Sequence, residues 1–262
     1  MTTRFSACIE LLFAAEASDP AERIRLAAAA GLHAVEFWSW RDKDLPSIAA
    51  ALEETRLTLT GFVSEPMAPL TDPAQHDAFL AGLEDSLSVA QGLGSTSLIA
   101  QAGPLHPHEP RETQRAAIVA CLTKAAETLS GTGVTLLLEP LNIRVDHPGY
   151  FLPFTPEALD IIDAVGRPEI RLLYDLYHSA VMGETPQDVL AGRIDRIGHV
   201  HLADAPGRQE PGTGTMDWRG RLDWLVQQGY GGFVGLEYRP SQGTVDSLSS
   251  LMGRSSASAP ID

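Results

Sequence analysis

The chain has 262 residues, with 19 basic and 34 acidic side chains, and therefore a formal net charge of −15 at pH 7. This charge repels phosphate backbones and anionic lipids, so it argues against nucleic-acid and membrane-surface partners. No apolar stretch approaches the ~20 residues of a membrane helix, and Glu10 and Glu16 interrupt the amino-terminal one. Cys8 and Cys121 stand alone, as is usual in the reducing cytoplasm, where we expect this protein.

Short apolar runs recur along the whole chain and predict eight strands, at residues 4–9, 34–38, 57–63, 97–100, 135–138, 171–174, 197–202 and 233–236. Between them, apolar residues at three- and four-residue spacing predict helices at residues 21–30, 48–55, 77–91, 114–129, 156–165 and 221–228. Several helices are expected to begin at a capping residue followed by proline, as at Asp19-Pro20 and Thr155-Pro156. Because many strands are continuously apolar, they suit a parallel sheet that is buried on both faces.

The alternation of strands and helices predicts a closed (β/α)8 TIM barrel, with about 33 residues in each βα unit. An open doubly wound sheet is the alternative, but no GxGxxG motif follows the first strand to support it. No linker divides the chain, so we expect one domain over residues 1–262. Residues 254–262, which end in SSASAPID, are expected to form a flexible tail.

Four consecutive predicted strands meet a metal-ligand type of side chain at their carboxyl ends. These residues are Glu139, Asp175, His201 and Glu237, with separations of 36, 26 and 36 residues. One such residue alone is usually a helix cap or a solvated loop residue, but a barrel would bring all four to its catalytic rim. Three adjacent carboxylates repel unless a cation neutralises them. Carboxylate oxygens with one imidazole favour Mg²⁺, Mn²⁺ or Co²⁺.

Other polar residues near the same rim are candidates for binding a substrate. His178 follows a strand and is either a substrate contact or an exposed loop histidine, while Arg208, in a Gly/Pro-rich loop, suits bidentate binding of a carboxylate. Glu36 ends an apolar stretch and either faces the barrel mouth, at the substrate, or forms an internal ion pair. His199 points the same way as His201 and is a core histidine or a partner of the site. Trp38 either lines a pocket or joins the core.

Several segments of the chain resemble the hydroxypyruvate isomerase family, which belongs to the xylose-isomerase-like barrels. They are LLLEPLN (136–142), DHPGYFL (146–152), LLYDLYH (172–178), HVHLADAPGRQEPGTG (199–214), GLEYRP (235–240) and SACIELLF (6–13). The resemblance spans nearly the whole chain. It implies a (β/α)8 barrel that converts hydroxypyruvate to tartronate semialdehyde.

The resemblance also implies roles for individual residues. Glu139 and Glu237 match the paired acid and base carboxylates. Related ketose 3-epimerases hold a metal at positions that look like Glu139, Asp175, His201 and Glu237, and touch substrate at positions that match His178 and Arg208. Many hydroxypyruvate isomerases have glutamine where this chain has His201, so this position looks more like the epimerase pattern.

The chemistry agrees with that resemblance. Moving a carbonyl between adjacent carbons requires proton transfer through an enediolate, which a divalent ion and two carboxylates can support. The leading hypothesis is therefore a metal-dependent isomerase of a small hydroxy-oxo acid, a small-molecule enzyme that could form a homo-oligomer. The alternatives are a C3 epimerase of free ketoses, a 2-oxo-tetronate isomerase, a metal-dependent hydrolase such as an apurinic endonuclease, and a non-catalytic sugar-acid binding protein.

Overall fold

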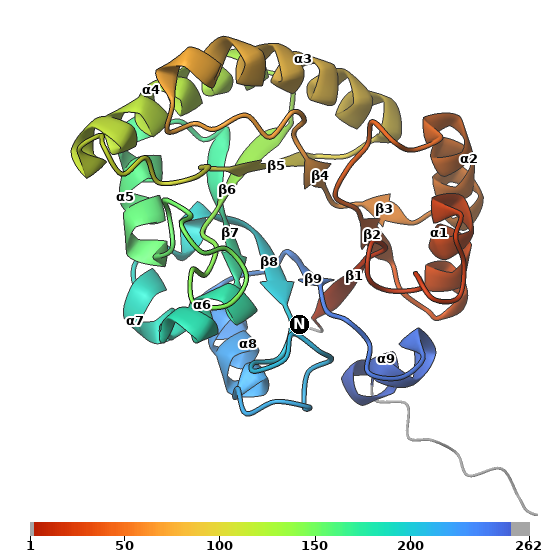
Figure 1. Ribbon diagram of the computed structural model, residues 1–262. Coiled ribbons are helices and arrows are strands. Elements are labelled where there is room, and N and C mark those ends of the chain that lie inside the picture. Colours follow the sequence, from red (N-terminus) through yellow and green to blue (C-terminus); the bar gives the residue numbers. More distant parts are fainter. Residues whose placement is uncertain (1–2, 253–262) are drawn as a thin grey trace, which may run out of the picture.

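The computed structural model, which describes residues 3–252, shows a central barrel of strands with helices around its outside (Figure 1). The strands are β1 (Arg4–Cys8), β2 (Ala34–Glu36), β3 (Thr58–Leu59), β4 (Phe62–Val63), β5 (Ser97–Gln101), β6 (Thr135–Glu139), β7 (Ile170–Asp175), β8 (Ile197–Leu202) and β9 (Phe233–Leu236). The α-helices are α1 (Pro20–Ala29), α2 (Leu45–Thr55), α3 (His76–Leu93), α4 (Arg111–Leu129), α5 (Thr155–Val165), α6 (Leu176–Met182), α7 (Pro186–Leu190), α8 (Trp218–Gln227) and α9 (Thr244–Met252). Two short 3₁₀ helices, η1 (Pro73–Gln75) and η2 (Ile194–Arg196), complete the order.

The sheet runs in the order β3-β2-β1-β9-β8-β7-β6-β5-β4. Its two ends, β3 and β4, are consecutive halves of the single strand predicted at residues 57–63. The break falls at Thr60 and Gly61, where Thr60 N–H donates to Val35 O at 2.9 Å. Val63 N–H then donates to Trp38 O at 3.0 Å, so one stretch of chain bridges both ends of the sheet. The predicted parallel barrel is confirmed, with its third strand divided.

The strands are buried because both of their faces are covered. Side chains such as Leu136, Leu138 and Leu172 are fully buried between the barrel and the surrounding helices. This is why the strands read as continuous apolar runs rather than as alternating ones. None of the helices within residues 3–252 is both long and apolar enough to cross a membrane.

The helix starts follow the predicted caps with one exception. Asp19 accepts from Ala21 N–H at the start of α1, as expected. Thr155 does not cap α5, because the helix already includes it and its hydroxyl instead donates to Glu184 at 2.7 Å. Helices α6 and α9 were not predicted, since they are short or close to the end of the chain. The tail expected at residues 254–262 lies outside the described residues.

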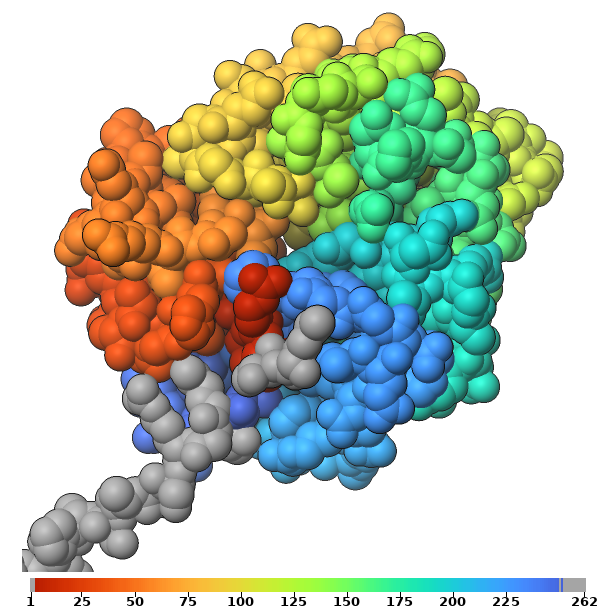
Figure 2. Space-filling view, turned by 180° about the vertical axis from the view of Figure 1, so that it is seen from behind, coloured from red at the N-terminus to blue at the C-terminus, as the bar shows by residue number. Residues whose placement is uncertain are grey.

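Figure 2 shows the end of the barrel at which β1 begins, with the chain circling it from red to blue. The strands are parallel, so their carboxyl ends, and the loops that follow them, gather at the opposite end. That end carries all four predicted metal ligands.

Candidate active site

The four predicted metal-ligand residues come together at the carboxyl ends of β6 to β9. Glu139 and Asp175 are the last residues of β6 and β7, His201 is in β8, and Glu237 directly follows β9. Asp175 and His201 are register partners on adjacent strands. Each of the four residues offers a ligand atom, and these atoms lie within 4.8 Å of one another. All four residues are buried, with at most 6% of the surface of each exposed.

The imidazole of His201 supports a cation at this cluster. Its Nδ1 lies 3.5 Å from Glu237 Oε2, 3.7 Å from Glu139 Oε1 and 4.0 Å from Asp175 Oδ2. This buried nitrogen has no hydrogen-bond partner among the described residues. A buried polar atom left unpaired is costly. A divalent ion among these four donors would accept the lone pair of the nitrogen and neutralise the charge of the three carboxylates.

Asp175 and Glu237 are already fixed by other donors. Asp175 Oδ1 accepts the backbone N–H groups of Tyr177 at 2.7 Å and His178 at 2.9 Å, because Asp175 caps α6. Its Oδ2 is the oxygen that faces His201. Glu237 Oε1 accepts the indole N–H of Trp38 at 2.7 Å, and its Oε2 accepts from Arg208 Nη2 at 2.6 Å. Both carboxylates are therefore held in place by the chain itself.

The surroundings shift the pKa values of the two glutamates in opposite directions. Burial raises the pKa of Glu139, and contact with His201 offsets only part of that rise. Burial also raises the pKa of Glu237, but His201 and then Arg208 outweigh burial and lower it. For His201, burial lowers the pKa, whereas Glu36 and Glu237 raise it well above its usual value. Environments that shift the pKa values of two neighbouring carboxylates in opposite directions are typical of an acid–base pair.

His178 presents one ring nitrogen to the same cluster. Its Nδ1 accepts the backbone N–H of Asn142 at 3.1 Å and lies 2.7 Å from the Asn142 side-chain amide nitrogen. The proton of the neutral ring is therefore expected on Nε2. That atom is buried, lies 3.8 Å from Asp175 Oδ2, and has no hydrogen-bond partner among residues 3–252. His178 can thus donate a hydrogen bond to an oxygen in the site.

Arg208 closes one side of the site. Its guanidinium lies over the ring of Tyr177, 5.2 Å from the ring centroid, and its Nη1 is 3.7 Å from Asp146 Oδ1. Arg208 Nε is buried and has no hydrogen-bond partner in the described part of the chain. Its backbone adopts φ 53°, and its N–H donates to Asp204 O at 3.0 Å.

Asp204 holds the Arg208 loop in shape. This fully buried carboxylate accepts backbone N–H groups from Ala205 at 2.8 Å, Gly212 at 2.6 Å and Met216 at 3.3 Å. The loop is therefore rigid where it presents Arg208 to the site.

Glu36 was expected to contact substrate, but the structure places it behind His201. It is 3% exposed and does not line the cavity beside the metal ligands. Its Oε2 lies 2.8 Å from His199 Nε2, and its Oε1 lies 3.0 Å from His201 Nε2. The internal ion pair is thus the alternative that the structure favours for Glu36. His199 is its partner rather than a member of the four-residue cluster.

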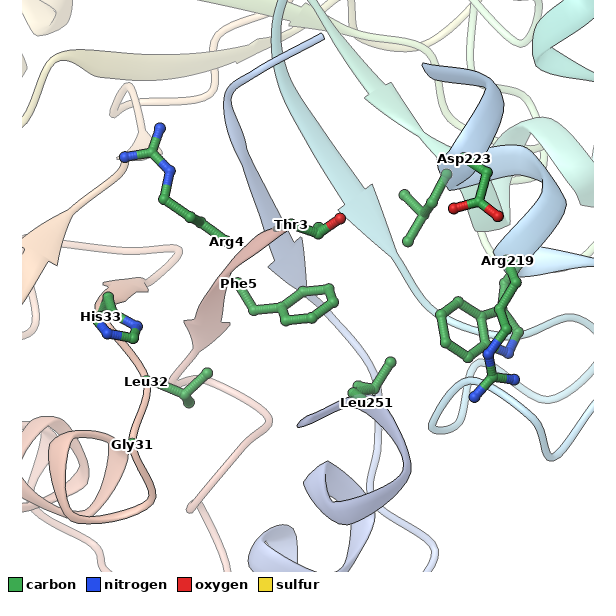
Figure 3. A pocket seen from close by; sticks show the side chains of 11 residues that line it. Thr3, Arg4, Phe5, Gly31, Leu32, His33, Arg219, Asp223 and Leu251 are labelled. Carbon is green, nitrogen blue, oxygen red and sulfur yellow. The ribbon is translucent and has the colours of Figure 1, made fainter. Parts of the chain in front are cut away.

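A cavity of about 380 Å³ opens beside the ligand cluster. Its polar wall contains Glu139, His178, His201, Arg208 and Glu237, and its other lining residues are Trp38, Ser39, Val63, Glu65, Met67, Ile99, Gln101, Leu141 and His147. A larger cavity of about 540 Å³ lies beside the start of β1 (Figure 3). There Asp223 and His33 stand on opposite sides, and no cluster of carboxylates and imidazoles forms. The volume of a cavity therefore does not identify the candidate active site here, whereas the cluster of carboxylate and imidazole side chains does.

The sequence did not single out several residues that shape this cavity. Asn142 orients His178, and Asp146 Oδ2 accepts from both the Asn142 amide at 2.6 Å and the Tyr177 hydroxyl at 2.8 Å. Glu65 accepts the backbone N–H groups of Trp40 and Arg41, which fixes the loop after β2. These residues lie in loops, so no periodic pattern marks them. Only their place a few residues beyond a strand end could have drawn attention to them.

The fold and this cluster define a parallel TIM barrel with a candidate metal centre at its carboxyl-terminal rim. A family model described as a xylose isomerase-like TIM barrel matches residues 24–253. The chain therefore belongs to the xylose isomerase-like TIM barrel family, and the predicted resemblance to its hydroxypyruvate isomerase members is confirmed.

Individual relatives cover nearly the whole chain. Hydroxypyruvate isomerase of Escherichia coli (strain K12) is 30% identical, over 92% of this chain and 95% of that protein. A 2-oxo-tetronate isomerase of Cupriavidus necator is also 30% identical, over 92% of this chain and 94% of that protein. A crystal structure described as AP endonuclease, family 2, from Brucella melitensis has a TM-score of 0.89 and 30% identity, and covers 97% of this chain and 99% of that one.

Proposed function

We propose that this protein is a metal-dependent isomerase that interconverts hydroxypyruvate and tartronate semialdehyde. Its family membership and its hydroxypyruvate isomerase relative make it an isomerase of the aldose–ketose type. One observation carries the rest of the proposal. Three buried polar atoms near one cavity, His201 Nδ1, His178 Nε2 and Arg208 Nε, have no hydrogen-bond partner among the described residues. Such atoms are suited to a cation and an oxygen-rich anionic substrate.

The ligand set fits a divalent ion such as Mg²⁺, Mn²⁺ or Co²⁺. Glu139, Asp175, His201 and Glu237 would hold it through three carboxylates and one imidazole. When bound, such an ion supplies positive charge that stabilises the enediolate oxygens of the substrate.

The reaction needs a proton to leave C3 of hydroxypyruvate, next to the carbonyl, and a proton to arrive at C2. Glu139 and Glu237 act as the acid–base pair, because their carboxylates face one another around His201 and differ in pKa. His178 donates an Nε2–H hydrogen bond to a substrate oxygen, which stabilises the negative charge that develops there. Arg208 binds the substrate carboxylate through Nε, since its Nη2 is engaged with Glu237.

A second candidate is a 2-oxo-tetronate isomerase, which performs related chemistry on a longer acid. The relative of that name in Cupriavidus necator favours it, and about 380 Å³ leaves room for a fourth carbon. Its substrate would use the same residues. The net charge of −15 argues against an apurinic endonuclease, so we propose a small-molecule substrate and no nucleic acid.

Proton NMR of hydroxypyruvate in D2O with metal-defined protein tests the proposal. We expect the C3 proton signal to decrease as deuterium enters from solvent and the signals of tartronate semialdehyde to appear. Glu139→Gln or Glu237→Gln should abolish both changes. Turnover of 2-oxo-tetronate with none of hydroxypyruvate would select the second candidate, and turnover of ketohexoses alone would favour a C3 epimerase.

A further inference from the structure

Glu36 and His199 form a buried layer of side chains beneath the candidate metal ligands. Its carboxylate bridges two imidazoles, with Oε2 at 2.8 Å from His199 Nε2 and Oε1 at 3.0 Å from His201 Nε2. The two imidazole rings meet edge to face, with centroids 5.1 Å apart. His201 therefore has one nitrogen toward Glu36 and the other toward the three carboxylates of the rim.

One hydroxyl group, which is itself in contact with a second hydroxyl, holds Glu36 from behind. Thr60 Oγ1 donates to Glu36 Oε2 at 2.9 Å and lies 2.9 Å from Ser6 Oγ. Ser6 is fully buried and Thr60 is 7% exposed. The carboxylate is thus fixed from two directions within the barrel interior.

Gly235 provides the space that Glu36 occupies. It is the register partner of His201 on β9, two residues before Glu237. A Cβ at this position would lie 2.3 Å from Glu36 Oε1 and 2.7 Å from Oε2. Glycine is needed here for close approach, because its φ is not among the positive ones. Two separate features of the sequence, Glu36 and Gly235, therefore serve the same contact.

We propose that Glu36 is a positioning residue that fixes His201 with Nε2 toward the barrel interior and Nδ1 toward a divalent cation. A histidine that binds a metal usually needs a partner for its other N–H, which sets the tautomer and ring orientation. Glu36 Oε1 is the acceptor that lies 3.0 Å from His201 Nε2, as an ion-pair contact without the alignment of a hydrogen bond, and Gly235 leaves the space for it. The inference rests on the proposed metal dependence and adds a residue that does not touch the metal or the substrate.

Metal binding tests this inference without any activity measurement. Titration calorimetry with Mn²⁺ gives the affinity, and the visible absorption of the Co²⁺ form reports the ligand geometry. We expect Glu36→Gln to weaken Mn²⁺ binding about 10- to 100-fold and to alter the Co²⁺ spectrum. Gly235→Ala keeps the carboxylate but displaces it, so it should produce a change in the same direction. This second variant preserves the test if Glu36→Gln fails to fold.

Gly198→Ala is the matched control. It lies on the same strand as His201, and its new Cβ would meet Leu137 Cδ2 at 2.4 Å rather than Glu36. It should lower thermal stability but leave Mn²⁺ affinity and the Co²⁺ spectrum unchanged. A wild-type protein that binds neither ion would overturn the proposed metal dependence and this inference with it. If Glu36→Gln and Gly235→Ala both bind Mn²⁺ with the wild-type affinity and give the wild-type Co²⁺ spectrum, this inference alone would be overturned.

Discussion

Removing the charge of Glu139 should stabilise the metal-free protein while it destroys the proposed activity. The ligand oxygen of Glu139 lies within 4.8 Å of those of Asp175 and Glu237. At an effective dielectric constant of ~20, each repulsion at that separation is about 3 kcal/mol. Attraction to a protonated His201, 3.7 Å away, offsets about 4 kcal/mol. The remaining penalty of about 2 kcal/mol disappears in Glu139→Gln.

Thermal unfolding followed by circular dichroism measures this effect. In EDTA, Glu139→Gln should unfold about 4–8 °C above the wild-type protein. Saturating Mn²⁺ should reverse the order, because only the wild type keeps its full ligand set and gains stability from binding. Asp204→Asn is the control, since this carboxylate accepts three backbone N–H groups and should lose stability when neutralised. A metal-free Glu139→Gln protein that is less stable than wild type would refute the repulsion argument.

EDTA should abolish isomerisation in the NMR assay, and Mn²⁺ or Co²⁺ should restore it; full activity after dialysis to a metal-free state would contradict the proposed cofactor. Asn142→Ala removes the side-chain amide beside His178 Nδ1 and keeps only the backbone N–H, so it should lower kcat about 10-fold while Mn²⁺ affinity stays within about twofold, as steady-state kinetics and calorimetry would show. Arg208→Lys removes Nε and should raise KM for hydroxypyruvate more than it lowers kcat. Burial raises the pKa of Glu36, but His201 and then His199 outweigh burial and lower it to well below the ordinary value of 4.5. The contribution of Glu36 to stability is therefore complete above about pH 4.5 and is lost as the pH falls through its lowered pKa. Urea unfolding at a series of acidic pH values checks this, and Glu36→Gln should flatten the dependence.

The barrel and the ligand cluster were predictable because they depend on periodic features of the sequence. Each strand is an apolar run, and a parallel barrel places all strand ends at one rim. Glu139, Asp175 and Glu237 stand at the same place in successive units, so their positions followed once the strands were assigned. His201 could be preferred to His199 because it lies closer to the carboxyl end of the strand. The roles of these residues in catalysis remain predictions.

The contacts around this cluster could not be predicted because they depend on geometry between distant elements. Glu36 has the sequence pattern of a residue at the barrel mouth, yet its side chain reaches across β1 to β8 and β9. Asn142 contacts His178 only because the loop after β6 folds against α6. The division of the predicted third strand at Thr60 and Gly61 also has no signal in hydrophobicity, since Leu57 to Val63 is largely apolar.

Strand periodicity connects these findings. Residues two apart on a strand face the same side, one layer apart, so His199 lies beneath His201 and Gly235 lies beneath Glu237. The upper layer concentrates carboxylates, which is unfavourable for folding without a cation. The lower layer gives His201 a carboxylate partner in Glu36, and it has room for that partner only because position 235 lacks a side chain. The charge of the site is therefore stabilised from inside the barrel, and substitutions in the lower layer should alter metal binding even though they touch neither metal nor substrate.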